Sequence, residues 1–373
     1  MDFDLQDVED WMRADESNDS RPPEPGGGNA AAIDVHSHAM PLPLLEWLER
    51  DGLADLSRIG DDVVLLDPTV SGVTKNAPLP LARSQYDAGT RLAEMNDLGV
   101  RAHAVSMPPF LYCSNSEDER FVTTTIARGN DELAGYIAEG GGRLYGLGSI
   151  PVGFPDAANE ARRCIEELGF QGVAIGTRGG GKELDDPVND DFWALLAERN
   201  VFVFVHPSGV PDVHRQRDYW LPQLVGYPME TALSIARMIY GRVFERFDLA
   251  MCLAHGGGCL PWLRGRLDLG WQRKEVAHTT DIPPSEFCKR LYYDTAVFDT
   301  TLLSHLVSDM GADRVLLGTD HPFELGDRNP VSTVHSLGLG AEDTEAILWR
   351  TADSLLGPRS SEQTAVRSAK HRS

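Results

Sequence analysis

Eight short apolar runs recur along the chain, and they constrain the fold more than any other feature of the sequence. Most of the runs are continuous rather than alternating, which is typical of parallel strands covered on both faces. Segments with helical spacing lie between them, for example 157–168 and 191–199. The predicted strands are 32–35, 102–106, 144–150, 172–176, 201–205, 249–254, 291–294 and 315–318.

Regular alternation of strands and helices predicts βαβ units and therefore a parallel sheet. Eight such units favour an α/β fold in which the sheet closes into a TIM-like (β/α)8 barrel. A doubly wound open sheet is the alternative, but the first run is not followed by the glycine-rich phosphate turn of such sheets. A chain of 373 residues fits a single barrel domain.

Composition divides the chain into three parts. Residues 1–30 are rich in Asp, Glu, Pro and Gly, which predicts a disordered acidic tail, although Leu5, Val8, Trp11 and Met12 have helical spacing and could dock on a partner subunit. Residues 31–356 form the predicted barrel. Residues 357–373 are polar and are expected to form a second disordered tail.

Charge and cysteine content exclude several classes of function. The net charge of -23 argues against nucleic acid and anionic membranes as partners. No apolar run approaches the roughly 20 residues that a membrane span needs, and the acidic N-terminus does not resemble a signal peptide. The 5 cysteines form no CxxC motif, so we expect free thiols and a cytoplasmic protein.

Histidines and an aspartate follow four of the predicted strands. The first strand ends in His36-Ser37-His38, and i and i+2 in a strand point to the same face. His206, His255 and Asp320 follow the fifth, sixth and eighth strands. In a barrel these strand ends meet on one face. The pattern predicts a divalent metal held by His36, His38, His206 and Asp320.

Three imidazoles and one carboxylate suit zinc with one position open for water, and manganese is also possible. His255 is then free to act as a general acid or base, since a metal lowers the pKa of bound water and an imidazole can accept its proton.

This constellation resembles the amidohydrolase superfamily. Members with two metals carry a carboxylated lysine at the end of the fourth strand, whereas this chain has Ile175-Gly176-Thr177-Arg178 there and its nearest lysine, Lys182, lies in a glycine-rich loop. The resemblance therefore implies a single metal.

Four further motifs are similar to those of aminocarboxymuconate semialdehyde decarboxylases, over about residues 33–355. They are 218–226, the triple glycine 256–258 with Pro261 and Gly265-Arg266, 293–296 and 317–320. This resemblance implies metal-dependent, non-oxidative decarboxylation of a small unsaturated or aromatic carboxylic acid, of carboxymuconate semialdehyde or hydroxybenzoate type. The alternative is a mononuclear metal-dependent hydrolase or hydratase of the same superfamily.

The resemblance also implies roles for individual residues. His36, His38, His206 and Asp320 match metal ligands and His255 matches the acid/base histidine. Trp220 and Arg266 match substrate-binding positions, although Trp220 could instead pack its loop and Arg266 could form a surface ion pair. Arg273 or Lys274 falls where the family has a residue serving a neighbouring subunit, which implies a homodimer.

Two positions depart from the family pattern. Leu79 stands where the family has an arginine that grips a substrate carboxylate, and Arg58, Lys75 and Arg83 are possible substitutes. His321 replaces a tyrosine and could contact the substrate.

Three further residues also carry expectations. We expect His103 to be a buried core histidine and Cys259 a small buried residue without a thiol role. Asp294 could orient a ligand imidazole or serve a structural hydrogen bond.

Overall fold

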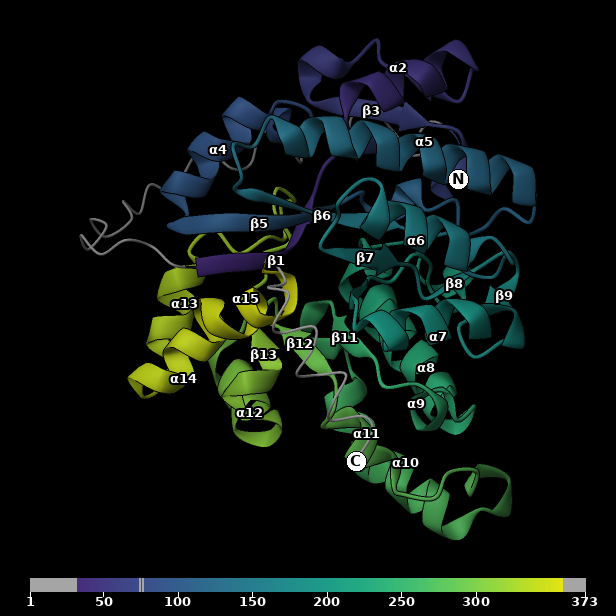
Figure 1. The fold of residues 1–373 in the computed structure, drawn as a ribbon, viewed down its shortest axis with the longest axis vertical. Helices are drawn as coiled ribbons and strands as arrows, with labels where there is room; N and C mark the ends of the chain where they lie inside the picture. Colours follow the sequence, from purple (N-terminus) through teal and green to yellow (C-terminus); the bar gives the residue numbers. More distant parts are fainter. Residues whose placement is uncertain (1–31, 74, 76, 358–373) are drawn as a thin grey trace.

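The computed structural model describes residues 32–73, 75 and 77–357, and its centre is an eight-stranded parallel barrel (Figure 1). The strands neighbour one another in the order in which they occur in the chain. They are β1 (Ala32–His38), β5 (Val100–Ser106), β6 (Leu144–Ser149), β7 (Gly172–Ile175), β10 (Phe202–Val205), β11 (Ala250–Leu253), β12 (Tyr292–Asp294) and β13 (Val315–Leu316). All eight predicted strands are thus confirmed, and with them the TIM-like barrel.

The barrel closes between its first and last strands. The Val35 amide donates to the Leu317 carbonyl at 2.9 Å, and the Asp320 amide donates to the His36 carbonyl at 2.9 Å. The His38 amide donates to the His321 carbonyl at 2.8 Å, beside a parallel bridge between Ser37 and His321. The closing seam therefore runs through the segments that carry the predicted site.

Helices cover the outside of the sheet and connect successive strands (Figure 1). Asp87, Asp118 and Asp299 each accept a backbone N–H at the start of a helix, which stabilises helix ends that otherwise lack partners. The α-helices are α2 (Leu42–Arg50), α3 (Pro68–Ser71), α4 (Ala88–Asp97), α5 (Glu119–Ala138), α6 (Ala157–Glu166), α7 (Asp190–Arg199), α8 (Tyr227–Tyr240), α9 (Val243–Arg246), α10 (Leu260–Arg273), α11 (Pro284–Cys288), α12 (Thr300–Met310), α13 (Pro330–Ser336), α14 (Ala341–Glu345) and α15 (Thr351–Leu356). No helix of the described ranges is long and apolar enough to cross a bilayer.

Alternation along β10 assigns its side chains to two packing layers. Val203 and Val205 join the hydrophobic cluster that includes Ile235 and Met238 of α8. Phe202 and Phe204 join a different cluster, and the Phe204 ring lies 4.8 Å from the His36 ring inside the barrel. The same alternation continues to His206, so its side chain enters the barrel mouth.

The connections after β1 and β7 contain short strands that were not predicted from the sequence. Within the first, β2 (Ala54–Asp55), β3 (Val63–Leu66) and β4 (Pro78–Pro80) form a small antiparallel sheet, and β4 buries Leu79. A short pair, β8 (Arg178–Gly179) and β9 (Lys182–Glu183), follows β7. The predicted tails lie outside the described residues, so their disorder and the domain limits stay predictions.

Candidate metal centre

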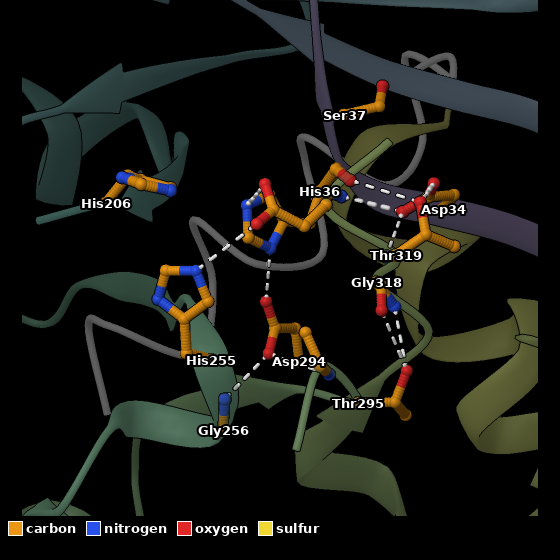
Figure 2. A network of polar contacts seen from close by, with 12 residues as sticks. Asp34, His36, Ser37, His206, His255, Gly256, Asp294, Thr295, Gly318 and Thr319 are labelled. Atoms are coloured by element: carbon orange, nitrogen blue, oxygen red, sulfur yellow. Dashed lines mark hydrogen bonds and ion pairs between the residues drawn. The ribbon is translucent and has the colours of Figure 1, made fainter. Parts of the chain in front are cut away.

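Five side chains meet at the carboxyl ends of four strands, as the sequence predicted. His36 and His38 end β1, His206 follows β10, His255 follows β11 and Asp320 follows β13. Ligand atoms of His36, His206, His255 and Asp320 all lie within 4.8 Å of one another. Figure 2 shows the His36 ring beside the rings of His206 and His255.

His38 belongs to the same cluster. Its Nε2 lies 3.2 Å from Asp320 Oδ1, and His36 Nε2 lies 3.0 Å from the same oxygen. The His38 ring is 5.2 Å from the His206 ring. His255 Nε2 approaches the other oxygen, Asp320 Oδ2, at 3.6 Å. Four histidines and Asp320 therefore form the cluster, which is one group more than the predicted ligand set.

Unsatisfied buried atoms indicate that this cluster suits a cation. His36 Nε2, His38 Nε2 and Asp320 Oδ1 are buried, and none of them has a well-oriented hydrogen-bond partner among the described residues. Buried polar atoms without partners are costly and rare, and they are expected where a bound ion completes the site. Imidazole nitrogens with one carboxylate oxygen form a donor set that suits a divalent metal.

Burial and charge determine the protonation of the cluster. Burial lowers the pKa of His38 to about 4 and holds that of His206 well below its ordinary value, so both imidazoles are neutral and have a lone pair to donate. Burial opposes charge on His36 too, but Asp320 and Asp294 outweigh it and raise the pKa to about 10. Burial would raise the pKa of Asp320, yet the His36 charge holds it well below the ordinary range.

Hydrogen bonds at Nδ1 orient the imidazole rings of His36 and His206. Asp294 Oδ2 lies 2.6 Å from His36 Nδ1, as the dashed line in Figure 2 marks, while Asp294 Oδ1 accepts the Gly256 amide at 2.7 Å. His206 Nδ1 lies 2.8 Å from the Pro207 carbonyl. A carboxylate or carbonyl at Nδ1 fixes the tautomer that leaves Nε2 for a metal. Asp294 therefore fills both of the roles considered for it, because one oxygen orients an imidazole and the other accepts backbone hydrogen bonds.

The backbone is strained at His255 and Asp320, with φ of +57° and +65°. Cys252 and Ala254 pack in the same cluster as Phe204, so simple alternation would turn His255 away from the barrel interior. The left-handed conformation at His255 brings its ring back to the cluster, and positive φ at a non-glycine residue is typical of functional sites. The glycines at 256–258, all with positive φ, allow this turn.

A buried polar network supports the end of β1. Asp34 Oδ1 accepts the His36 and Thr319 amides at 2.9 and 3.1 Å, and Thr319 Oγ1 donates to Asp34 Oδ2 at 2.5 Å. Burial raises the pKa of Asp34 to about 7 despite these bonds. His103 is fully buried, as expected, with Nε2 3.6 Å from Asp34 Oδ2 and Nδ1 3.2 Å from an Arg91 amine.

Sequence reasoning did not identify Asp34 or Arg91 as part of the site. Arg91 is fully buried and donates to the His38 carbonyl. Asp34, two residues before His36, could have been noticed as a polar residue inside an apolar strand. A single arginine on an amphipathic helix gives no such signal.

The predicted substrate-binding residues lie in different places. His321 follows Asp320 directly, and its Nε2 lies 3.1 Å from Glu94 Oε2. Trp220 is 42% exposed in the connection after β10. Arg266 is exposed on α10, which extends away from the barrel at the bottom of Figure 1, and Arg273 and Lys274 lie at the end of the same helix. The structure of the single chain does not bring Arg266 into the metal cluster.

The possible substitutes for the first-loop arginine are also placed. Arg58 Nε pairs with Asp61 at 3.2 Å and Arg83 pairs with Asp87 at 3.2 Å, while Lys75 is exposed. Both arginines are thus engaged in local ion pairs.

A parallel barrel with histidines and an aspartate gathered at its strand ends defines a class of metal-binding barrel proteins, and a comparison with family models agrees. The model described as amidohydrolase matches residues 33–357. The chain therefore belongs to the amidohydrolase family, which confirms the resemblance drawn from its motifs.

Particular relatives are similar over most of the chain. The 2-amino-3-carboxymuconate-6-semialdehyde decarboxylase of Dictyostelium discoideum is 36% identical over 73% of this chain and 77% of its own length. A protein of the same name from Caenorhabditis elegans is 28% identical over 87% of this chain and 94% of its own. The gamma-resorcylate decarboxylase of a Polaromonas species is 28% identical over 71% and 86% of the two chains.

Solved structures share the fold. The 5-carboxyvanillate decarboxylase of Sphingomonas paucimobilis matches with a TM-score of 0.73 at 22% identity, covering 88% of this chain and 99% of its own. A dihydroxybenzoic acid decarboxylase of Polaromonas, with bound manganese and the inhibitor 2-nitroresorcinol, has a TM-score of 0.72 at 21% identity, covering 89% and 98%.

Proposed function

We propose that the protein is a metal-dependent, non-oxidative decarboxylase, a carbon–carbon lyase that acts on a small unsaturated or aromatic carboxylic acid of carboxymuconate semialdehyde or hydroxybenzoate type. The observation that carries this proposal is the cluster of histidine and aspartate ligand atoms within 4.8 Å at the barrel mouth. The 36% identical relative is named as a decarboxylase of an unsaturated acid, and the other reported relatives are named as decarboxylases too.

We assign His36, His38, His206 and Asp320 as the metal ligands and His255 as the general acid/base. Exposure separates the two roles, because the side chains of His36 and His38 are 0% exposed while that of His255 is 15% exposed. A ligand should be enclosed, whereas a group that exchanges protons with a substrate must reach the mouth. The competing assignment places His255 among the ligands instead of His38, because its ligand atom lies in the compact group of four.

Decarboxylation replaces a carbon–carboxylate bond by a carbon–hydrogen bond and releases carbon dioxide, so the site must supply one proton and stabilise negative charge. A bound divalent metal polarises substrate oxygens and supplies that stabilisation. His255 holds the proton and delivers it to the carbon that loses the carboxylate. Asp294 keeps His36 in the orientation that the ligand set needs, through the 2.6 Å contact at Nδ1.

Finer features of the proposal rest on single observations. Zinc suits the imidazole-rich ligand set, and manganese is the alternative because a structural neighbour holds it. Trp220, Arg266 and His321 are proposed substrate contacts, and Arg273 or Lys274 at the end of α10 is proposed to serve the site of a neighbouring subunit in a homodimer. All five cysteines are free, which favours a reducing compartment such as the cytoplasm.

The test is carbon dioxide release by the zinc- or manganese-loaded protein from a panel of carboxymuconate semialdehydes and hydroxybenzoates, with chelator-treated protein as the control. We expect metal-dependent release from at least one member of the panel. Product that has instead gained the elements of water would indicate a hydrolase or hydratase and would refute the decarboxylase proposal.

A further inference from the structure

Tyr227 is the first residue of α8, and its ring borders the metal cluster. The centre of this ring lies 5.8 Å from the centre of the His206 ring, and the two rings are nearly perpendicular, at 83°. The next residue, Pro228, accepts a hydrogen bond at 3.2 Å from the amide of Cys259, which follows the glycines after His255. The start of α8 is therefore held between the two strand ends that carry His206 and His255.

The hydroxyl of Tyr227 has no hydrogen-bond partner among the described residues, and the residue is only partly buried. The charge of Asp320 reaches the phenol, because burial and this charge together raise the pKa of Tyr227 to about 12. A tyrosine is protonated at neutral pH even without such a shift, so the hydroxyl can donate a hydrogen bond. An unused donor therefore lies beside the proposed ligands.

The acceptor atoms of the neighbouring ligands are already engaged. His206 Nδ1 lies 2.8 Å from the Pro207 carbonyl, and the other nitrogen of this ring is assigned to the metal. Asp320 Oδ1 lies 3.0 Å from His36 Nε2 and 3.2 Å from His38 Nε2. Polar groups that are partly removed from water ordinarily find a hydrogen-bond partner. The acceptor for the phenol hydroxyl is therefore left to water or to a substrate that displaces this water.

We propose that the Tyr227 hydroxyl donates a hydrogen bond to an oxygen of the bound substrate and so helps to determine which acids the site accepts. The inference rests on the proposed function, which supplies an acid with a carboxylate and, in hydroxybenzoates, a neighbouring hydroxyl. Either oxygen can accept the bond, and an ionised oxygen forms the stronger one. Tyr227 is thus a specificity-determining residue that contacts the substrate without ligating the metal or transferring the proton.

The test compares the wild type with Tyr227→Phe, which keeps the ring beside His206 and removes only the hydroxyl. Calorimetry measures the binding of 2-hydroxybenzoate and of benzoate to the manganese-loaded proteins. We expect Tyr227→Phe to bind 2-hydroxybenzoate about tenfold or more weakly, the effect of one hydrogen bond to a charged acceptor. An equal loss with benzoate places the bond at the carboxylate, whereas unchanged benzoate binding places it at the neighbouring hydroxyl oxygen.

The control is Tyr240→Phe at the other end of α8, which removes a hydroxyl that donates to the Leu267 carbonyl at 2.9 Å and should leave both affinities unchanged. The inference is overturned if the wild type binds neither probe, if Tyr227→Phe binds 2-hydroxybenzoate as the wild type does, or if Tyr240→Phe weakens binding equally. Metal content and thermal unfolding of each variant show whether the fold is preserved. Tyr227→Leu, which also lacks the hydroxyl, gives a second reading if Tyr227→Phe does not fold.

Failure of this inference can be distinguished from failure of the proposed function, because calorimetry measures binding and carbon dioxide release measures turnover. Carbon dioxide release by a protein whose affinities do not depend on Tyr227 would refute the Tyr227 contact alone. A Tyr227-dependent affinity in a protein that releases no carbon dioxide from the whole panel would refute the decarboxylase proposal and leave the contact standing.

Discussion

The histidines of the metal cluster differ in the hydrogen-bond partners of their Nδ1 atoms. His36 and His206 each have an oxygen within 2.8 Å of Nδ1, so their second nitrogens are presented to a metal. His255 Nδ1 is buried and has no hydrogen-bond partner in the described part of the chain, and its backbone has a φ of +57°. His255 thus lacks the support at Nδ1 that His36 and His206 have.

The first prediction separates ligand from acid/base. His255→Ala should keep stoichiometric metal and lose turnover by about 10² to 10⁴-fold, the usual contribution of general acid–base catalysis. His38→Ala should lose the metal itself. Elemental analysis and a carbon dioxide assay on both variants distinguish the metal ligand from the general acid/base. A His255→Ala protein that loses its metal would favour the competing ligand set.

The second prediction concerns Asp294. Asp294→Asn keeps the side-chain shape, but its amide cannot accept from His36 Nδ1 and from the Gly256 amide in the same way. We expect metal affinity to fall about 10- to 100-fold, as for other partners of ligand histidines. Metal titration measures the change. Asp313→Asn, with a side chain that is 76% exposed, is the matched control and should bind metal normally.

At the scale of elements, α4 stabilises the end of β1 through the side chain of Arg91. Arg91 Nε donates to the Ser84 carbonyl at 3.1 Å and to the Tyr136 hydroxyl at 2.7 Å. A terminal nitrogen of the same guanidinium donates to the His38 carbonyl. One side chain thus joins the first long connection, α5 and the strand that carries His36 and His38. This buried arginine fixes the direction in which β1 leaves the barrel.

The third prediction follows from this contact set. Arg91→Met should lower the free energy of unfolding by about 2–5 kcal/mol, since it leaves buried acceptors without donors. Arg101→Met, which removes a 43% exposed arginine 3.5 Å from Asp353, should change it by about 0.5 kcal/mol or less. Denaturant unfolding compares the two, and equal stability of both variants would contradict the role of Arg91.

Strand positions could be read from the sequence because buried parallel strands are continuous apolar runs, and β10 with Phe202 to Val205 is the clearest case. The metal cluster could be predicted because a barrel brings all strand ends to one face. The small sheet β2–β3–β4 could not, because β2 and β4 are only partly buried and so lack the continuous apolar pattern of the barrel strands. The left-handed turn at His255 and the Arg91 network also depend on tertiary contacts that no local pattern records.

Over the whole molecule, α10 is a helix of 14 residues of which Leu260 alone is buried. Trp262 is 66% exposed and Leu269 is 44% exposed on this projecting helix, and Val276 just beyond it is 90% exposed. Large apolar side chains gathered on one protruding element are typical of protein–protein contact surfaces.

The fourth prediction is therefore that the protein is a homodimer through α10. Trp262→Glu combined with Leu269→Glu should halve the mass measured by light scattering, because each introduced charge would be buried without a partner. Leu302→Glu on α12, at a site 40% exposed, is the control and should leave the dimer intact. A monomeric wild type would refute the prediction.

The fifth prediction concerns metal removal. If metal binds the folded chain and not the unfolded one, a metal concentration 100 times the dissociation constant stabilises the fold by about 2.7 kcal/mol. Chelation should lower the melting temperature and added zinc or manganese should restore it. His38→Ala should show no metal-dependent shift, and a wild type that melts identically with and without metal would argue against the site.

The seam between β1 and β13 has a consequence for biosynthesis. The ribosome synthesises the His36-Ser37-His38 segment long before Asp320. The two histidines therefore lack this carboxylate until the segment that carries Asp320 has been made. Until β13 emerges the sheet keeps two open edges, which are sites of mispairing between chains. The pairing of β1 with the segment after β13 that closes the barrel also brings Asp320 to the histidines proposed as ligands, so metal uptake can report that a nascent chain has closed its barrel.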